Sequence, residues 1–447
     1  MSRPVVALVG RTNVGKSTLL NRILGERYAV VDDRPHVTRD RLIVPVEWGG
    51  RQLVVVDTGG WGLDAVSGMD LKVRRQAEMA IGQADVIMLV VSATDGVIPS
   101  DSDAVELVRS ANKPIVLVVN KVDHETHEAR VGEFHKLGID TVVGVSALHN
   151  RGIDELMDAV VAKLPPEEPQ VAYPEGAIRL AIVGRPNAGK STLLNALLGD
   201  ERAIVDEQPG TTRDPLDAEL QWQGKRLVLV DTAGIRKKTR VTYGVDYFSV
   251  LRALQAIDRC DVAILVLDAT EPATAQDVTI ARYVCEAGRG LVLVVNKWDL
   301  VPAESRDAHK DWLQRRLEFF SFVPVLHVSA KEGRHVKSVL QRAYEVSRAR
   351  ELRLSRSAVD AAIKESVERH SPPKVGTRRL DIIWANQHDV ETWKFVLHVN
   401  DPALMPSNYV RYLEHDLRRQ FGYHGVPLLF EIVAAGRKRR SRQEKSV

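Results

Sequence analysis

Short apolar runs alternate along the chain with segments of helical spacing. Val5–Val9, Val86–Val91 and Ile115–Val119 are uninterrupted runs of five to six residues, rich in valine and isoleucine. Such runs are typical of parallel strands that are buried on both faces of a sheet. Residues Lys72–Gln83 and Tyr247–Ala256 have the spacing of helices. This alternation predicts an α/β fold with doubly wound, mostly parallel sheets, whose ligand-binding loops lie at the carboxyl ends of the strands.

The chain contains an internal repeat. Residues Leu8–Arg41 align with Ile182–Pro215 without a gap, at a constant offset of 174 residues. Later positions shared by the two copies are displaced by 176 and then by 183 residues. The second copy therefore carries short insertions, which fall between motifs where loops tolerate them. This register predicts two copies of one domain in tandem.

The pattern changes at two places outside the repeats. Residues 165–176 are rich in proline and acidic residues and lack apolar periodicity, which indicates an exposed linker. After about residue 350 the repeat ends, and the elements predicted there are helices at 355–369 and 408–421 and strands at 379–385, 393–399 and 426–433. We therefore expect a first domain at 1–164, a second at 177–350 and a small α+β domain with a basic tail at 351–447.

Composition excludes several classes of protein. A hydrophobic share of 44% with 27% charged residues is typical of a globular protein, neither disordered nor membranous. The N-terminus enters a strand almost at once, without the pattern of a signal peptide, so we expect a cytoplasmic location. Cys260 and Cys285 are the only cysteines, so a zinc site or disulfide framework is not expected.

Positive charge is concentrated near the C-terminus. Residues 351–447 contain 17 Lys/Arg against 12 Asp/Glu, whereas the rest of the chain has 45 against 47. A polyanionic partner for this segment is therefore plausible. The tail Arg437–Arg440 could bind phosphates, although a short basic terminus is often only solvated.

A phosphate-binding motif, the P-loop, occurs in both copies. The pattern G-x-x-x-x-G-K-[ST] each time follows an apolar run and precedes a helical segment, which is the context that the motif requires. Its glycines let backbone N–H groups surround phosphates, its lysine contacts the β- and γ-phosphate oxygens, and its serine ligates magnesium. The first motif comprises Gly10, Arg11, Thr12, Asn13, Val14, Gly15, Lys16 and Ser17, and the second Gly184, Arg185, Pro186, Asn187, Ala188, Gly189, Lys190 and Ser191. One match alone would indicate only some nucleotide.

A second motif, D-T-x-G, lies between the P-loop and the later motifs. Asp57 and Asp231 each end a hydrophobic strand, where a carboxylate can hold the hydration shell of magnesium, and the motif's last glycine can donate its N–H to the γ-phosphate. Thr38 and Thr212 are the expected mobile threonines, which join the P-loop serine around magnesium in the triphosphate state. The two segments are Asp57, Thr58, Gly59, Gly60 and Trp61, and Asp231, Thr232, Ala233, Gly234 and Ile235.

Two further motifs point to guanine. Each N-K-x-D tetrad follows an apolar strand, and its aspartate can accept the N1–H and 2-amino hydrogens of guanine, which adenine does not offer. An unpaired carboxylate there would cost about 1–3 kcal/mol, so ATP is expected to be rejected. A Ser-Ala pair after the next strand supplies backbone contacts to the guanine oxygen. These residues are Asn120, Lys121, Val122, Asp123, Ser146 and Ala147, and Asn296, Lys297, Trp298, Asp299, Ser329 and Ala330.

The motif set resembles that of translation-factor-type GTPases, and its tandem arrangement before an α+β domain resembles the Der (EngA) family. The motifs cover about the first 350 residues. The resemblance implies binding of GTP and GDP with magnesium, GTP hydrolysis, a KH-like C-terminal domain, and binding to the large ribosomal subunit through ribosomal RNA. We expect a monomer away from the ribosome, with no DNA or membrane partner. No clear G-x-x-G loop of an RNA-clamping KH domain is expected in the C-terminal segment.

The residue after each D-x-x-G is not the glutamine that orients water in many small GTPases. Trp61 and Ile235 stand there, and neither side chain can orient water by hydrogen bonding. In related GTPases a P-loop asparagine helps to hold potassium, so Asn13 and Asn187 predict potassium-stimulated hydrolysis. The alternative is that they only shape the loop. The residues expected to be catalytic are Lys16, Thr38, Asp57, Gly60, Lys190, Thr212, Asp231 and Gly234.

The two copies differ just before the mobile threonine. His36 stands in the first copy where Gly210 stands in the second, and histidine lacks the conformational freedom of glycine. The first site could therefore switch differently while still binding nucleotide. Two alternatives stay open: one site could be a structural, non-cycling GTP site, or the chain could be a GTPase of transfer-RNA modification or of membranes. The absence of an additional catalytic cysteine motif or a lipidation signal counts against the second.

Overall fold

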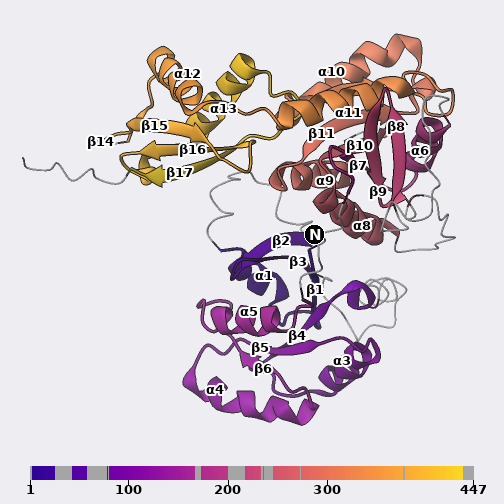
Figure 1. Ribbon diagram of the computed structural model, residues 1–447. Coiled ribbons are helices and arrows are strands. Elements are labelled where there is room, and N and C mark those ends of the chain that lie inside the picture. Colours follow the sequence, from indigo (N-terminus) through magenta and orange to yellow (C-terminus); the bar gives the residue numbers. More distant parts are fainter. Residues whose placement is uncertain are drawn as a thin grey trace, which may run out of the picture. The chain divides into compact units, whose positions relative to one another are not determined.

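The computed structural model describes residues 3–25, 43–57, 78, 80–166, 173–199, 217–232, 235, 245–271, 273–375 and 378–435. They fall into two compact units (Figure 1). One unit, residues 1–171 and 239–251, contains the first α/β domain. The other, residues 172–238 and 252–447, contains most of the second α/β domain and the C-terminal domain. Within these ranges no helix is both long enough and apolar enough to cross a membrane.

The first domain is built on a six-stranded sheet in the order β2-β3-β1-β4-β5-β6. β2 is antiparallel to β3, and the other neighbouring strands are parallel. Every residue of β1 and β4 is buried, which explains their unbroken apolar sequences. The strands are β1 (Val5–Val9), β2 (Ile43–Trp48), β3 (Arg51–Asp57), β4 (Val86–Ser92), β5 (Ile115–Asn120) and β6 (Val142–Gly144), and the helices are α1 (Lys16–Leu24), α3 (Pro99–Ser110), α4 (Glu125–Val131), η2 (Gly132–Leu137) and α5 (Ile153–Ala162).

The second domain repeats this topology, with the sheet order β8-β9-β7-β10-β11-β12. The predicted helix at Tyr247–Ala256 lies within α8, whereas only the end of the one predicted at Lys72–Gln83 belongs to the described residues. The strands are β7 (Ile178–Val183), β8 (Ala218–Trp222), β9 (Lys225–Val230), β10 (Val262–Asp268), β11 (Gly290–Asn296) and β12 (Val325–His327), and the helices are α6 (Lys190–Leu198), α8 (Val245–Arg259), η3 (Trp298–Leu300), α9 (Ala275–Glu286), η4 (Ala303–Ser305), α10 (Arg306–Arg316), η5 (Glu318–Phe320) and α11 (Val336–Arg350).

The C-terminal domain has the predicted order of elements. It also contains a hairpin, β13–β14, whose strands have two residues each. In its three-stranded sheet β16 pairs antiparallel with β15 and parallel with β17. Ser355 caps the first helix, because its side chain accepts a hydrogen bond from the backbone N–H of Ala358. The elements are α12 (Arg356–Arg369), β13 (Lys374–Val375), β14 (Arg378–Arg379), β15 (Ile382–Gln387), β16 (Lys394–Val399), η6 (Pro402–Leu404), α13 (Ser407–Phe421) and β17 (Leu429–Ala434).

The second and C-terminal domains share one hydrophobic cluster. The Leu291 N–H donates to the Gly425 carbonyl at 2.7 Å, which links β11 to the loop before β17. The Arg350 guanidinium lies 4.0 Å from the centre of the Trp393 ring, and its Nε donates to the Gly288 carbonyl at 3.0 Å. These contacts between segments far apart in sequence join the two domains as one packed unit.

The spacing G-x-x-G occurs once in the C-terminal domain, at Gly422–Gly425 between α13 and β17. Tyr423 within it is fully buried against Phe395, with the two rings edge to face. A Cβ on Gly425 would lie 2.9 Å from the Leu291 carbonyl oxygen. This loop therefore packs against the second domain, and it is not a free clamp for RNA.

Candidate functional site

In both α/β domains the P-loop passes directly over the neighbouring strand. A Cβ on Gly10 would lie 2.4 Å from the Val90 carbonyl oxygen, and one on Gly184 would lie 2.4 Å from that of Val266. Only glycine fits these positions without moving the backbone. The helices that follow, α1 and α6, have no side-chain cap and no acidic residue in their first turn. Their N–H groups are thus left available to an anion.

The P-loop lysines fold back onto their own loops. Lys16 Nζ donates to the carbonyls of Gly10 at 2.9 Å and Arg11 at 2.8 Å. Lys190 makes the equivalent bonds to Gly184 and Arg185, both at 2.7 Å. Burial lowers the pKa of each ammonium group to about 8, against an opposing attraction from Asp57 in the first site and Asp277 in the second. A phosphate group would supply the missing negative charge, so both lysines fit a nucleotide.

The asparagines of the N-K-x-D tetrads hold three loops together. Asn120 Nδ2 donates to the Val14 carbonyl at 2.8 Å, and its Oδ1 accepts from the Ala147 N–H at 3.1 Å. Asn296 makes the same two bonds, at 3.0 Å each, to Ala188 and Ala330. Sequence reasoning assigned these asparagines to base recognition and missed this brace, because it depends on which loops meet at the sheet edge.

The base-selecting aspartates receive hydrogen bonds from the serine of the Ser-Ala pair. Ser146 Oγ donates to Asp123 Oδ1 at 2.5 Å. In the second domain the hydrogen bond from Ser329 lowers the pKa of the Asp299 carboxyl. Each serine also closes a tight loop through two backbone hydrogen bonds. Ser146 makes them with Arg151, and Ser329 makes them with Arg334. A carboxylate held in this way can accept two hydrogens from a guanine edge.

The groups predicted to hold magnesium are arranged differently in the two domains. Ser17 Oγ lies 3.4 Å from Asp57 Oδ2, so a hydroxyl and a carboxylate sit side by side as magnesium binding requires. In the second domain Ser191 Oγ donates instead to the Ile235 carbonyl at 2.9 Å, and Asp231 adopts a left-handed φ of 56°. The first pair fits magnesium as it stands, whereas Ser191 must release Ile235 to reach a metal.

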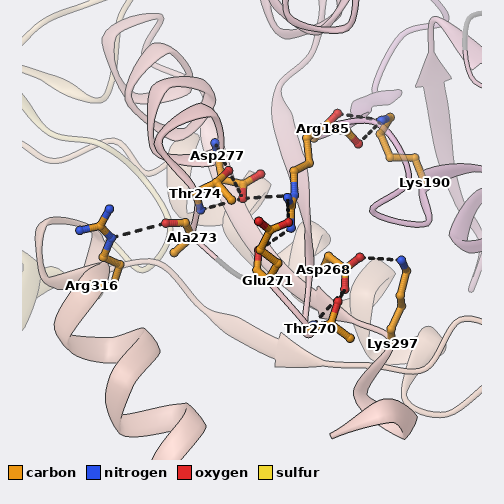
Figure 2. Close-up of polar contacts among 11 residues, drawn as sticks. Arg185, Lys190, Asp268, Thr270, Glu271, Ala273, Thr274, Asp277, Lys297 and Arg316 are labelled. Atoms are coloured by element: carbon orange, nitrogen blue, oxygen red, sulfur yellow. Dashed lines mark hydrogen bonds and ion pairs between the residues drawn. The ribbon is translucent and has the colours of Figure 1, made fainter. Parts of the chain in front are cut away.

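The P-loop arginines, predicted to contact nucleotide, are bonded to acidic residues outside the loop. Arg185 donates to Glu271 Oε2 at 2.5 Å and lies 3.7 Å from the buried Asp277 (Figure 2). Arg11 makes an ion pair with Asp95 and lies 3.8 Å from Asp101. Each arginine therefore ties the P-loop to the segment that leads into α3 or α9. No motif in the sequence marks these acids.

Several predicted positions lie outside the described residues. They are the two threonines predicted to join magnesium, most of each D-T-x-G segment, and the positions where the two copies differ just before that threonine: Thr38, Thr212, Thr58, Gly59, Gly60, Trp61, Ala233, Gly234, His36 and Gly210. Thr232 is described and buried. Within the described ranges no group of three or more His, Cys, Asp or Glu side chains could hold a metal ion. A magnesium site would therefore depend on the nucleotide and on the serine and aspartate of each domain.

Known proteins share both the repeat and the C-terminal domain. A family model described as 50S ribosome-binding GTPase matches residues 5–121 and again residues 179–297. A model described as KH-domain-like of EngA bacterial GTPase enzymes, C-terminal, matches residues 353–432. GTPase Der of Pelotomaculum thermopropionicum is 44% identical over 434 residues, covering 97% of this chain and 98% of that protein. The chain belongs to the GTPase Der family.

Other members of the GTPase Der family also align over nearly the whole chain. The one from Caldanaerobacter subterraneus subsp. tengcongensis is 42% identical over 439 residues, covering 98% of this chain and all of that protein. A crystal structure of Aquifex aeolicus Era covers 68% of this chain at 21% identity with a TM-score of 0.33. Family membership makes this chain a GTPase with two GTPase domains and a KH-like domain, and it implies guanine nucleotide with magnesium.

Proposed function

We propose that this chain is a cytoplasmic assembly factor for the large ribosomal subunit, and that the nucleotide in its two GTPase domains controls its association with ribosomal RNA. The observation that carries the proposal is the doubled nucleotide site in one chain with a KH-like domain. The family description as a 50S ribosome-binding GTPase supports it. So does the excess of 17 Lys/Arg over 12 Asp/Glu at 351–447, since counterion release from RNA favours basic surfaces.

The residues of each site would act as follows. Lys16 and Lys190 turn from their own loop carbonyls to phosphate oxygens, whose charge restores the usual lysine pKa. The P-loop serine and the strand-end aspartate hold magnesium, which neutralises charge on the phosphates. Asp123 and Asp299 select guanine, while the neighbouring asparagines keep the loops in register.

We also infer that potassium, held with the help of Asn13 and Asn187, stimulates hydrolysis, because Trp61 and Ile235 cannot orient water. Both asparagines adopt a left-handed backbone, with φ of 64° and 62°. Asparagine tolerates this conformation better than most residues, so shaping the loop is the competing role. Phosphate release should be several times faster in potassium than in sodium at equal ionic strength. Equal rates would leave the asparagines with the loop-shaping role alone.

Co-sedimentation with purified ribosomal subunits tests the ribosomal role. The full chain is incubated with 50S or 30S subunits in the presence of GTP, a non-hydrolysable analogue or GDP. We expect the chain to pellet with 50S subunits and to respond to the nucleotide, with the analogue favouring association. Association that is independent of nucleotide, or a preference for 30S subunits, would contradict the proposal.

The P-loop serines of the two domains have different hydrogen-bond partners, and this difference favours a second candidate function. In it, one site is a structural, non-cycling GTP site. Ser191 is engaged by the Ile235 carbonyl, whereas Ser17 lies beside its aspartate. Single Lys16→Ala and Lys190→Ala variants separate the candidates. Two cycling sites predict that each variant loses part of the phosphate release. A structural site predicts that one variant retains the full rate but loses bound nucleotide.

A further inference from the structure

The last residue of the central strand differs between the two GTPase domains. β4 ends at Ser92 and β10 ends at Asp268. These positions are equivalent, because Ser92 pairs with Asn120 and Asp268 pairs with Asn296 in the same parallel register. Each therefore lies next to the first residue of the N-K-x-D tetrad, at the strand end where the base-recognition loop begins.

Asp268 is bonded through both carboxylate oxygens. Oδ2 accepts from Lys297 Nζ at 2.5 Å, and Oδ1 accepts from the Thr270 N–H at 2.9 Å and its hydroxyl at 2.7 Å (Figure 2). Burial acts to raise the pKa of Asp268, but the hydrogen bonds from Lys297 and Thr270 outweigh it and lower the pKa. The carboxylate is thus ionised at neutral pH and fixed in orientation. It holds the lysine of the tetrad in one position.

The first domain lacks this restraint. Ser92 Oγ lies 2.8 Å from Thr94 Oγ1, and Thr94 in turn donates to Asp95. Among the described residues the Lys121 ammonium makes no hydrogen bond or ion pair. The pKa of Asp95 is lowered mainly by its hydrogen bond from Arg11, and the charge of Lys121 adds only a weaker attraction to this already paired carboxylate. The two lysines have the same left-handed backbone, with φ of 66° at Lys121 and 63° at Lys297. The difference between them is therefore confined to the side chain.

We propose that Asp268 is a positioning residue that makes the second site release guanine nucleotide more slowly than the first. The inference rests on guanine binding at both sites. Lys297 lies two residues before Asp299 on the same loop, and its side chain is ordered before nucleotide arrives. A free lysine must lose rotamer freedom when it is immobilised against a ligand, and this cost falls on Lys121 alone. Preorganisation of this kind mainly slows dissociation.

Release of a fluorescent GDP measures the effect one site at a time. Lys16→Ala silences the first site for measurements on the second, and Lys190→Ala does the converse. In the second site, Asp268→Ser should accelerate release at least fivefold, about 1 kcal/mol at 1.4 kcal/mol per tenfold. In the first site, Ser92→Asp should slow release by a similar factor, because Thr94 already occupies the place of Thr270 and can orient the new carboxylate.

A double-mutant cycle with Lys297 distinguishes positioning from a general structural role. If Asp268 acts through Lys297, then Asp268→Ser should change release less than twofold in a Lys297→Ala background. Thr270→Ala, which keeps the carboxylate and the lysine contact, is the matched control and should change release less than twofold. The proposal is overturned if Asp268→Ser has no effect, or if its effect is undiminished without Lys297.

The Ser92→Asp variant keeps the test decisive if Asp268→Ser does not fold, since it adds a group to an intact site. Unchanged release from the first site in that variant would also overturn the proposal. Failure of the proposed ribosomal role is a separate result, because the chain would then not associate with 50S subunits while GDP release from both sites would stay measurable. If neither site of the parent chain bound guanine nucleotide, there would be no release to compare, and the premise of guanine binding itself would fail.

Discussion

The two GTPase domains share their frame and differ in the groups attached to it. The lysine bonds to the P-loop carbonyls, the asparagine brace and the close approach of the P-loop glycine to the next strand recur in both. Two features do not recur. The P-loop serine contacts Asp57 in the first domain and the Ile235 carbonyl in the second. The residue behind the tetrad lysine is Ser92 in the first domain and Asp268 in the second. The two copies share the bonds that shape the P-loop and the tetrad, whereas the partner of the P-loop serine and the residue behind the tetrad lysine differ.

The strongest test of the shared frame removes a P-loop lysine. Lys16→Ala and Lys190→Ala should each lower kcat/KM of the affected site by about 10³-fold, because a donor aimed at developing charge is lost. Single-turnover GTP hydrolysis measures the effect when each single variant is compared with the double variant Lys16→Ala/Lys190→Ala, because the remaining site would otherwise mask the loss. If the domains are equivalent in chemistry, the two losses should agree within about threefold. A large loss from one variant alone would break the equivalence.

Removal of the asparagine brace should come next in size. Asn120→Ala or Asn296→Ala leaves a buried carbonyl and a buried N–H without partners, which should destabilise the affected domain by about 2–4 kcal/mol. Asn→Asp at the same position keeps the acceptor but turns a second oxygen toward the Val14 or Ala188 carbonyl and buries a charge, so its loss should be at least as large. Hydrogen–deuterium exchange can locate the loss in each domain. Unequal effects of the two alanine variants would show that the braces, despite their matching bonds, do not carry equal weight.

The buried lysines predict a pH dependence that both sites share. Without nucleotide the pKa of Lys16 and of Lys190 is about 8, and bound phosphate raises it, so binding takes up a proton above pH 8. GDP affinity should therefore fall as the pH rises through 8, by about tenfold between pH 7 and pH 9. GDP titrations at a series of pH values test this, with the first site measured in Lys190→Ala and the second in Lys16→Ala. An affinity that is flat over this range would contradict the assigned role of the lysines.

Replacing the P-loop serines Ser17 and Ser191 should have the smallest effect on stability. The size of that effect should differ between the two domains. In the nucleotide-free chain Ser191→Ala removes the 2.9 Å hydrogen bond to Ile235 and should cost about 1 kcal/mol. Ser17→Ala removes only a 3.4 Å contact, and less than about 0.5 kcal/mol is expected. Denaturant unfolding followed in each domain by hydrogen exchange measures both. Equal costs would remove the structural distinction between the two serines.

Much of the fold could be predicted because the local signals are strong. The runs at Val5–Val9 and Val86–Val91 became buried parallel strands, and each P-loop links a strand to a helix as its motif requires. The hairpin β13–β14 was missed because two-residue strands leave no periodic pattern. The partners of Arg11 and Asp268 depend on tertiary packing: Asp95 lies 84 residues from Arg11 in sequence. Spacing alone does not reveal such contacts.

The most direct test of two retained binding sites is a count of guanine nucleotides per chain. Titration of the nucleotide-free protein with GDP should give two per chain for the parent and one for each of Lys16→Ala and Lys190→Ala. The parent should also show two phases of release, and the slower phase should disappear in Lys190→Ala. A single nucleotide per parent chain would contradict the conclusion that both copies have kept their binding chemistry.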